Sequence, residues 1–173
     1  TNNYNAIAER SAAAEDLLLW INWLDTQTVE QRETALLRSA LCQHQFASLH
    51  AASGLYRSAF VSLRLFLELS FAALSFSMNI LALMEWFTGR TEHHFSALVS
   101  SEDGVLSQRV AAAFLPPAAD HVESFRLNAV AAYRSCSRQV HGNIETIGPT
   151  LDNTNFDEEV LQSWQSCANR AED

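Results

Sequence analysis

The sequence contains no lysine, and all eleven of its basic residues are arginines. Glycine and proline are scarce as well, at five and three residues in a chain of 173. So few turn-forming residues disfavour a fold of many short strands and favour long helices. Apolar residues recur every three or four positions, and no strand-like alternation competes with that spacing. We therefore predict an all-α fold, with residues 1–173 forming a single helical domain.

The three cysteines, Cys42, Cys136 and Cys167, form neither an even set for disulfides nor a C-x-x-C metal pair. Free thiols in a reducing cytosol are the simplest interpretation. No basic and apolar leader of the kind found in signal peptides is present. The apolar run Leu69–Met84 carries no charge, but it is shorter than the roughly 20 residues of a membrane helix, and Asn79 interrupts it. We predict a cytoplasmic protein without a membrane span.

Acidic residues outnumber basic ones, twenty to eleven, and the formal net charge is −9. This balance excludes a broad electrostatic hold on nucleic acid, because such binding derives most of its affinity from neutralised phosphates. A nuclease of this composition needs a local basic cleft, which Arg134 and Arg138 could form together with a symmetry mate. A basic protein partner would also match the charge.

Apolar spacing and turn residues divide the chain into predicted helices. We expect long helices over residues 4–25, 28–53, 55–76, 118–143 and 156–171, and short helices over 81–87 and 105–115. Thr28 and Gln31 have the spacing of a capping box, and Pro116-Pro117 should end the second short helix. Residues 90–103 are expected to form a loop with at most one helical turn. The charged end at Asp173 is compatible with further residues beyond it.

The segment from Ala132 to Asn143 combines cationic, imidazole and hydroxyl side chains at helical spacing. At about 100° per residue, Arg134 and His141 lie about 20° from eclipsed, with Arg138 on the same stripe. A histidine beside guanidiniums can act as a general acid or base while the cations stabilise charge on a phosphate. The same spacing is also typical of a solvated helix face. Gly142-Asn143 should end the helix.

This segment resembles the motif of the HEPN superfamily, whose members are small helical bundles. The resemblance is carried by Tyr133-Arg134, Cys136-Ser137 and Val140-His141-Gly142-Asn143. In that family an arginine, four to six residues and a histidine mark a metal-independent ribonuclease centre, and six residues separate Arg134 from His141. Ser135 matches the polar residue that often follows the arginine. A broader likeness to bacterial HEPN-like proteins of unassigned role spans about residues 30–165 and includes Tyr56–Arg64.

The resemblance implies an antiparallel four-helix bundle with short inserted helices, which forms a homodimer in which two motif helices meet. It implies Arg134 and His141 as the catalytic residues. His141 would activate the ribose 2′-hydroxyl or protonate the leaving 5′-oxygen, and Arg134 would hold the scissile phosphate. Tyr133 fits equally well as a core aromatic. The supporting residues implied are Arg138, Ser137, Tyr133, Ser135 and Asn143.

The implied function is a metal-independent endoribonuclease of a toxin or antiviral defence system. Its substrate would be RNA, since only RNA has the 2′-hydroxyl that serves as the nucleophile. No cofactor or metal is expected, and a regulatory protein partner or antitoxin would fit such a system. The alternative is a non-catalytic HEPN-like helical module that binds a partner, a nucleotide or RNA, and the net charge of −9 favours this alternative.

The remaining histidines have simpler interpretations. His44 and His50 fit polar positions at the rim of a helix. His93-His94 fit a surface loop, because adjacent helical residues diverge by about 100° and no carboxylate or thiol completes a metal set. None of these residues is expected to take part in catalysis.

Two further pairs leave alternatives open. Trp20 and Trp23 fit core or interface aromatics better than base-stacking residues. Arg64 and Glu68 have i, i+4 spacing, and they form either a buried or interfacial ion pair or a support for the catalytic site.

Overall fold

The computed structural model describes residues 2–27, 32–141 and 156–172, and these residues contain helices and no strand. The all-α prediction is therefore confirmed for this part of the chain. The long helices are α1 (Asn2–Gln27), α2 (Arg32–Ala52), α3 (Tyr56–Met78), α7 (Val122–Val140) and α9 (Glu158–Glu172). The short ones are α4 (Ile80–Phe87), α5 (Phe95–Leu98), α6 (Gln108–Phe114) and the 3₁₀ helix η1 (Pro116–His121).

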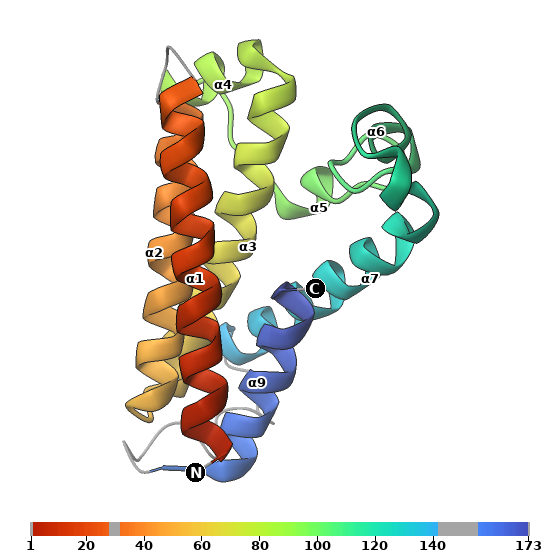
Figure 1. Ribbon diagram of the computed structural model, residues 1–173. Coiled ribbons are helices and arrows are strands. Elements are labelled where there is room, and N and C mark those ends of the chain that lie inside the picture. Colours follow the sequence, from red (N-terminus) through yellow and green to blue (C-terminus); the bar gives the residue numbers. More distant parts are fainter. Residues whose placement is uncertain (1, 28–31, 142–155, 173) are drawn as a thin grey trace.

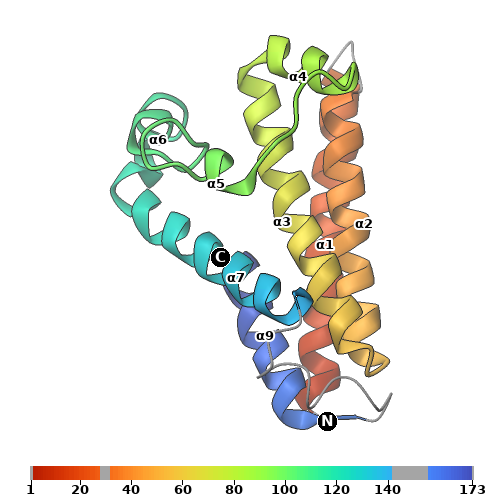
Figure 2. The ribbon, with the colours of Figure 1, turned by 180° about the vertical axis from the view of Figure 1, so that it is seen from behind.

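Helices α1, α2 and α3 run side by side in alternating directions, with α4 at one end of this layer (Figure 1). Helix α7 crosses the layer obliquely, and its last turns approach the beginning of α3. Figure 2 shows the same arrangement from behind, with α5 and α6 standing beside the first part of α7. Helix α9 packs against both α3 and α7. The end of α7 is thus the place where three long helices meet.

Side-chain caps explain several helix boundaries. The Asn79 side chain accepts a hydrogen bond from the Ala82 N–H at 3.1 Å, and α4 starts directly after it. The Ser107 hydroxyl likewise accepts a hydrogen bond from the Val110 N–H at 3.3 Å. Helix α6 therefore begins at Gln108 and not at the predicted residue 105. The expected capping box at residues 28–31 lies outside the described residues.

The helix predicted over 118–143 divides at its beginning. Pro116-Pro117 occupies the first positions of a 3₁₀ helix, where their missing N–H groups cost no hydrogen bond, and the α-helix begins only at Val122. Between α2 and α3, Gly54 has φ +73°, a left-handed conformation that glycine adopts without steric penalty. That turn reverses the chain and sets α3 antiparallel to α2.

The largest core cluster lies between α2, α3, α7 and α9. Its largest fully buried side chains are Trp164 and Phe60, each of which contributes on the order of 1.5–3 kcal/mol by leaving water. Cys136 of α7 and Cys167 of α9 face each other in this cluster, with their Sγ atoms 3.3 Å apart. Both thiols are free, as is the exposed Cys42. This shared core holds α7 against α3.

A buried polar cluster joins α1, α2 and α9. Arg10 donates hydrogen bonds to Glu172 and Asn169, and His44 Nε2 lies 2.8 Å from Glu172 Oε1. His44 is only 6% exposed, so its predicted position at a helix rim is wrong. The reason is that α9 covers this part of α2 and supplies the carboxylate that satisfies the imidazole.

Trp20 and Trp23 are 64% and 54% exposed and contact each other edge to face, with ring centroids 5.7 Å apart. They therefore do not belong to the core of the chain, while the interface role stays a prediction. Ile21, between them, is buried and packs against Leu41 of α2. The apolar spacing of α1 thus overstated how much of this helix the fold covers.

One helix among the described residues, α3, is long and apolar enough to cross a membrane. Its most apolar window is 44% buried, because α2, α7 and α9 pack around it. Central helices of soluble proteins have the same composition, and the buried part of α3 belongs to such a core.

Candidate functional site

The two predicted catalytic residues lie at the end of α7. Arg134 is an exposed residue within the helix, and His141 is the exposed residue that directly follows it. The His141 N–H donates to Ser137 O at 3.0 Å, which closes the final turn. Gly142 and Asn143, the predicted helix stop and a predicted supporting residue, lie outside the described residues.

An arginine from α3 contacts the histidine. Arg64 Nη1 lies 3.2 Å from His141 Nε2. Because a guanidinium only donates hydrogen bonds, Nε2 accepts in this contact and any ring proton is on Nδ1. Two helix turns earlier on α3, Arg57 Nη2 donates to Val140 O at 2.9 Å and satisfies a carbonyl at the end of α7.

Arg64 also belongs to a hydrogen-bonded network with Glu68 and Tyr133. Arg64 donates to Glu68 Oε1 from Nε at 3.3 Å and from Nη2 at 3.2 Å. Its Nη2 also donates to the Tyr133 hydroxyl at 2.8 Å, and that hydroxyl donates to Glu68 Oε1 at 2.7 Å. The predicted Arg64–Glu68 pair is confirmed, and it contacts the motif helix through Tyr133.

The network shifts the pKa of two of its groups. Burial alone would lower the pKa of Arg64, but Glu68 and Tyr133 outweigh it and raise the pKa. Burial, followed by the hydrogen bond to Glu68, raises the pKa of Tyr133. Both shifts favour the guanidinium cation and the neutral phenol, so the fold stabilises the charged form of Arg64, in its ion pair with Glu68, next to His141.

Tyr133 is also fixed by its ring. The ring stacks on Phe95 of α5, with centroids 3.8 Å apart and planes at 5°, and the Arg64 guanidinium lies 4.9 Å from its centroid. Tyr133 is thus both a packed aromatic and a hydrogen-bonding residue, so the two interpretations of its role are not exclusive.

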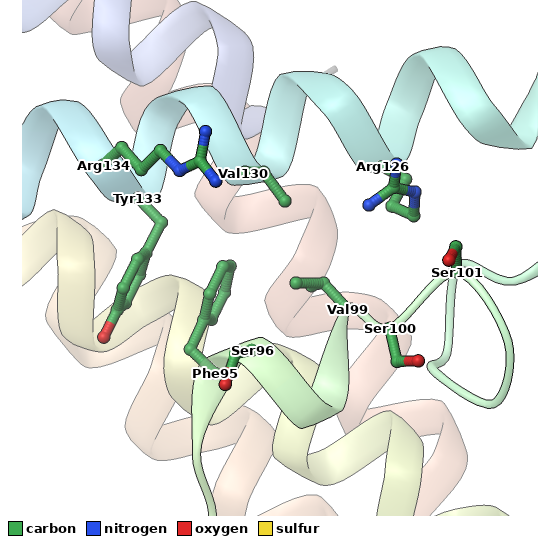
Figure 3. Close-up of a pocket in the computed structure, with 9 residues that line it drawn as sticks. All are labelled: Phe95, Ser96, Val99, Ser100, Ser101, Arg126, Val130, Tyr133 and Arg134. Carbon is green, nitrogen blue, oxygen red and sulfur yellow. The ribbon is translucent and has the colours of Figure 1, made fainter.

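A pocket of about 410 Å³ opens between α5 and α7 (Figure 3), and Tyr133 and Phe95 form one end of it. Arg134 extends over it from α7, and Ser100 and Ser101 face it from the loop after α5. Arg134 makes no hydrogen bond or ion pair within the part of the chain that the structure describes. Nine residues line the pocket: Phe95, Ser96, Val99, Ser100, Ser101, Arg126, Val130, Tyr133 and Arg134.

The loop that forms one wall of the pocket depends on Gly104. The Gly104 N–H donates to Ser100 O at 3.0 Å, and the Val105 N–H donates to Leu98 O at 2.9 Å, so the loop closes on itself. A Cβ at position 104 would lie 2.5 Å from Ser100 O and 2.6 Å from Leu98 O. Only glycine permits this close approach of backbone to backbone.

The structure divides the predicted site into two parts. His141 lies with Arg64, whereas Arg134 faces the pocket. Arg138 Nη2 donates to Ser135 Oγ at 3.3 Å on the surface of α7. The partly buried Ser137 has an Oγ without a hydrogen-bond partner in the described residues. The sequence spacing predicted one stripe for these side chains, but the elements that pack against α7 give Arg134 and His141 different surroundings.

Sequence reasoning missed the α5 side of the pocket. Phe95, Ser96 and Val99 lie in the segment predicted as a loop with at most one helical turn, and α5 is that turn. Their spacing contains no signal of contact with α7, which follows more than twenty residues later. Only the tertiary structure could reveal them.

The other histidines stay apart from this site. His93 packs edge to face on Phe76, with centroids 4.4 Å apart, and burial, followed by the neighbouring His94, lowers the pKa of His93. His50 lies 3.4 Å from Ser62 Oγ. Residues 2–27, 32–141 and 156–172 contain no group of three or more His, Cys, Asp or Glu side chains that could hold a metal ion.

Comparison with protein-family models, curated proteins and solved structures finds no match for this chain. The functional conclusion therefore depends on the chemistry and geometry of the residues described above.

Proposed function

We propose that the protein is a metal-independent endoribonuclease with a HEPN-like arrangement, in which Arg134 and His141 are the catalytic residues. The observation that carries the proposal is the concentration of cations around the end of α7. Arg57 and Arg64 reach it from α3, and Arg134 and Arg138 lie on α7 itself. Arg64 contacts His141 itself, and the other three lie within two helix turns of the end of α7, in a chain of net charge −9. Such a local concentration of arginines would favour a phosphate in spite of the overall charge.

The chemistry follows from the hydrogen-bonding groups. His141 takes the proton of a ribose 2′-hydroxyl, the 2′-oxygen forms a bond to phosphorus, and the bond from phosphorus to the 5′-oxygen breaks. The Arg64 guanidinium exchanges its contact with His141 Nε2 for a phosphate oxygen, which frees the nitrogen, and Arg134 steadies the developing charge with help from Arg138. The products are a 2′,3′-cyclic phosphate and a 5′-hydroxyl, and no metal takes part.

The second proton transfer requires another acid at the leaving 5′-oxygen, and a two-fold homodimer would supply it as the partner subunit's His141. Such a dimer would join two α7 helices of antiparallel four-helix bundles. A cytoplasmic toxin or antiviral effector with a regulatory protein partner is the setting that suits the activity. Light scattering should give twice the chain mass of 19.3 kDa, and a monomer at high concentration would contradict the composite site.

The test is cleavage of mixed single-stranded RNA by the purified protein with chelator present. His141→Ala should abolish cleavage, and Arg134→Ala should slow it by about 10²–10³, equivalent to about 2.7–4 kcal/mol. Arg138→Ala should have a smaller effect. His50→Ala is the matched control, since His50 lies on α2 beside Ser62 and stacks on Phe46, outside the contacts of Arg64, Tyr133 and His141, and it should cleave like the wild type.

A specific observation favours a second function. Arg64 already satisfies His141 Nε2, as expected of a structural histidine, and the motif could then belong to a non-catalytic module that binds RNA, a nucleotide or a protein. If the wild-type protein binds RNA without cleaving it, or if His141→Ala cleaves as fast as wild type, the catalytic proposal fails and the binding module replaces it.

A further inference from the structure

The pocket between α5 and α7 is chemically unlike the rest of this acidic protein. Its lining contains two arginines and three serines but no carboxylate. Among the carboxylates on neighbouring positions, Glu123 accepts two hydrogen bonds from Arg126, at 2.6 and 2.8 Å, and Asp103 pairs with Arg109 at 3.1 Å. Glu68 accepts from Tyr133 and Arg64, and Glu102 follows the lining residue Ser101 but does not itself line the pocket. A positive site without a lining anion suits a negatively charged ligand.

The two arginines of the pocket are not equivalent. Arg126 is held by Glu123 in a bidentate pair, so its charge is largely neutralised and it serves as a wall. Arg134 extends over the opening without an ion pair among the described residues (Figure 3). Arg134 is therefore the group that can take a phosphate, and Ser100 and Ser101 offer hydroxyls across the pocket.

The floor of the pocket is apolar. Val130 extends into it from α7 and Val99 from the end of α5, and the Phe95 ring lies beside them, as Figure 3 shows. One face of the Phe95 ring is covered by Tyr133, and Phe71 contacts the ring at a centroid distance of 5.7 Å. A ligand therefore meets Phe95 on the side away from Tyr133 together with the valine methyl groups, which suits a flat ring held by van der Waals contact.

We propose that this pocket binds one nucleotide of a single-stranded RNA, with its phosphate on Arg134 and its base against Val99, Val130 and Phe95. The volume of about 410 Å³ is within the range of small-molecule sites and admits one nucleotide. The inference rests on the proposed function in taking RNA as the ligand. It adds to that function a binding site for the nucleotide next to the scissile phosphate. Arg134 belongs to both the pocket and the proposed catalytic site, so it would connect the two.

Binding is measured by fluorescence anisotropy with a labelled short single-stranded RNA of mixed sequence, in a His141→Ala background that prevents cleavage. Ser96→Trp fills the pocket from its exposed rim and should weaken binding about tenfold. Arg134→Gln should weaken binding and reduce the slope of log K against log salt by about 0.7, the value for one phosphate contact on a single strand. Ser163→Trp on α9 and Arg90→Gln after α4 are the matched exposed controls and should bind like the parent.

Competition identifies the ligand. A mixture of nucleoside 5′-monophosphates should displace the RNA at much lower concentration than inorganic phosphate does. Equal potency of the two would overturn the nucleotide pocket, because it would mean that only the phosphate is bound. If Ser96→Trp loses its helical circular dichroism, Ser101→Trp at the other end of the same wall takes its place.

The two proposals fail separately. A wild-type protein that binds RNA through the pocket but does not cleave it refutes the nuclease and leaves the pocket in place. A protein that cleaves RNA, while Ser96→Trp and Ser101→Trp bind as tightly as their parent, refutes the pocket and leaves the nuclease in place.

Discussion

Removing the Tyr133 hydroxyl is the most direct test of how α3 and α7 are joined. Tyr133→Phe keeps the ring stacked on Phe95 but deletes two hydrogen bonds, one from Arg64 at 2.8 Å and one to Glu68 at 2.7 Å. Each bond involves a charged partner, and such bonds contribute about 1.5–3 kcal/mol in buried surroundings.

The expected loss is smaller than the sum of the two bonds. The side chains of Arg64 and Glu68 are 25% and 33% exposed, so water replaces part of what the hydroxyl supplied. The two also keep their direct ion pair at 3.2 Å, so neither charge is left unpaired. We expect Tyr133→Phe to lower the free energy of unfolding by about 1–2 kcal/mol, which corresponds to about 2–8 °C in melting temperature for a domain of this size.

A double-mutant cycle isolates the contribution of the network. Urea unfolding of wild type, Tyr133→Phe, Glu68→Ala and the double variant should give a coupling free energy of about 0.5–3 kcal/mol. The matched control pairs Glu68→Ala with Tyr56→Phe. Tyr56 accepts a hydrogen bond from the Asp157 N–H at 3.0 Å, and it lies twelve residues before Glu68, about 18 Å along α3. That pair should be additive within about 0.5 kcal/mol.

The pH dependence gives a second check. The pKa of Tyr133 is raised in the folded state, so its stabilising contribution is fully present below the ordinary tyrosine value of about 10 and is lost as pH rises through the folded value. The stability difference between wild type and Tyr133→Phe should therefore shrink above about pH 10. Zero coupling with Glu68, or a difference that does not change at high pH, would refute the network as the link between the helices.

Two other predictions concern the packing around the site. The pKa of Glu172 is lowered in the fold, because burial, which alone would raise it, is outweighed by His44 and Arg10. The stabilising contribution of the Glu172 carboxylate is present above the ordinary glutamate pKa of about 4.3 and is lost as pH falls through the folded pKa. Between about pH 5 and 3 the melting temperature of wild type should therefore fall more than that of Glu172→Gln. The exposed control Glu92→Gln should follow wild type in the same thermal unfolding experiment. Gly104→Ala should displace the loop over the pocket and lower the melting temperature, because the added Cβ would collide with the carbonyl oxygens of Ser100 and Leu98. A crystal structure of the variant in which this loop is unchanged would contradict that collision.

Much of the helical structure could be predicted from the sequence, because its causes are local. Hydrogen bonds in a helix join residues four apart, and the caps at Asn79 and Ser107 act within one turn. The beginning of α7 was misplaced because periodicity does not distinguish an α-helix from the short 3₁₀ helix Pro116–His121 that precedes it. The exposure of Trp20 was missed because an apolar stripe does not say how far a neighbouring helix extends over it.

The sequence by itself determined that the described part of the chain is helical, that Arg134 and His141 come together at the end of one long helix, and that Arg64 and Glu68 pair across one turn. Only the tertiary structure decided that Arg64 contacts Tyr133 and His141, which lie 69 and 77 residues further along the chain. It also decided that Arg134 faces a pocket completed by α5. The physical reason is that spacing along a helix is set by its own backbone, whereas the partners of a helix face depend on which distant segments bury their apolar surface against it.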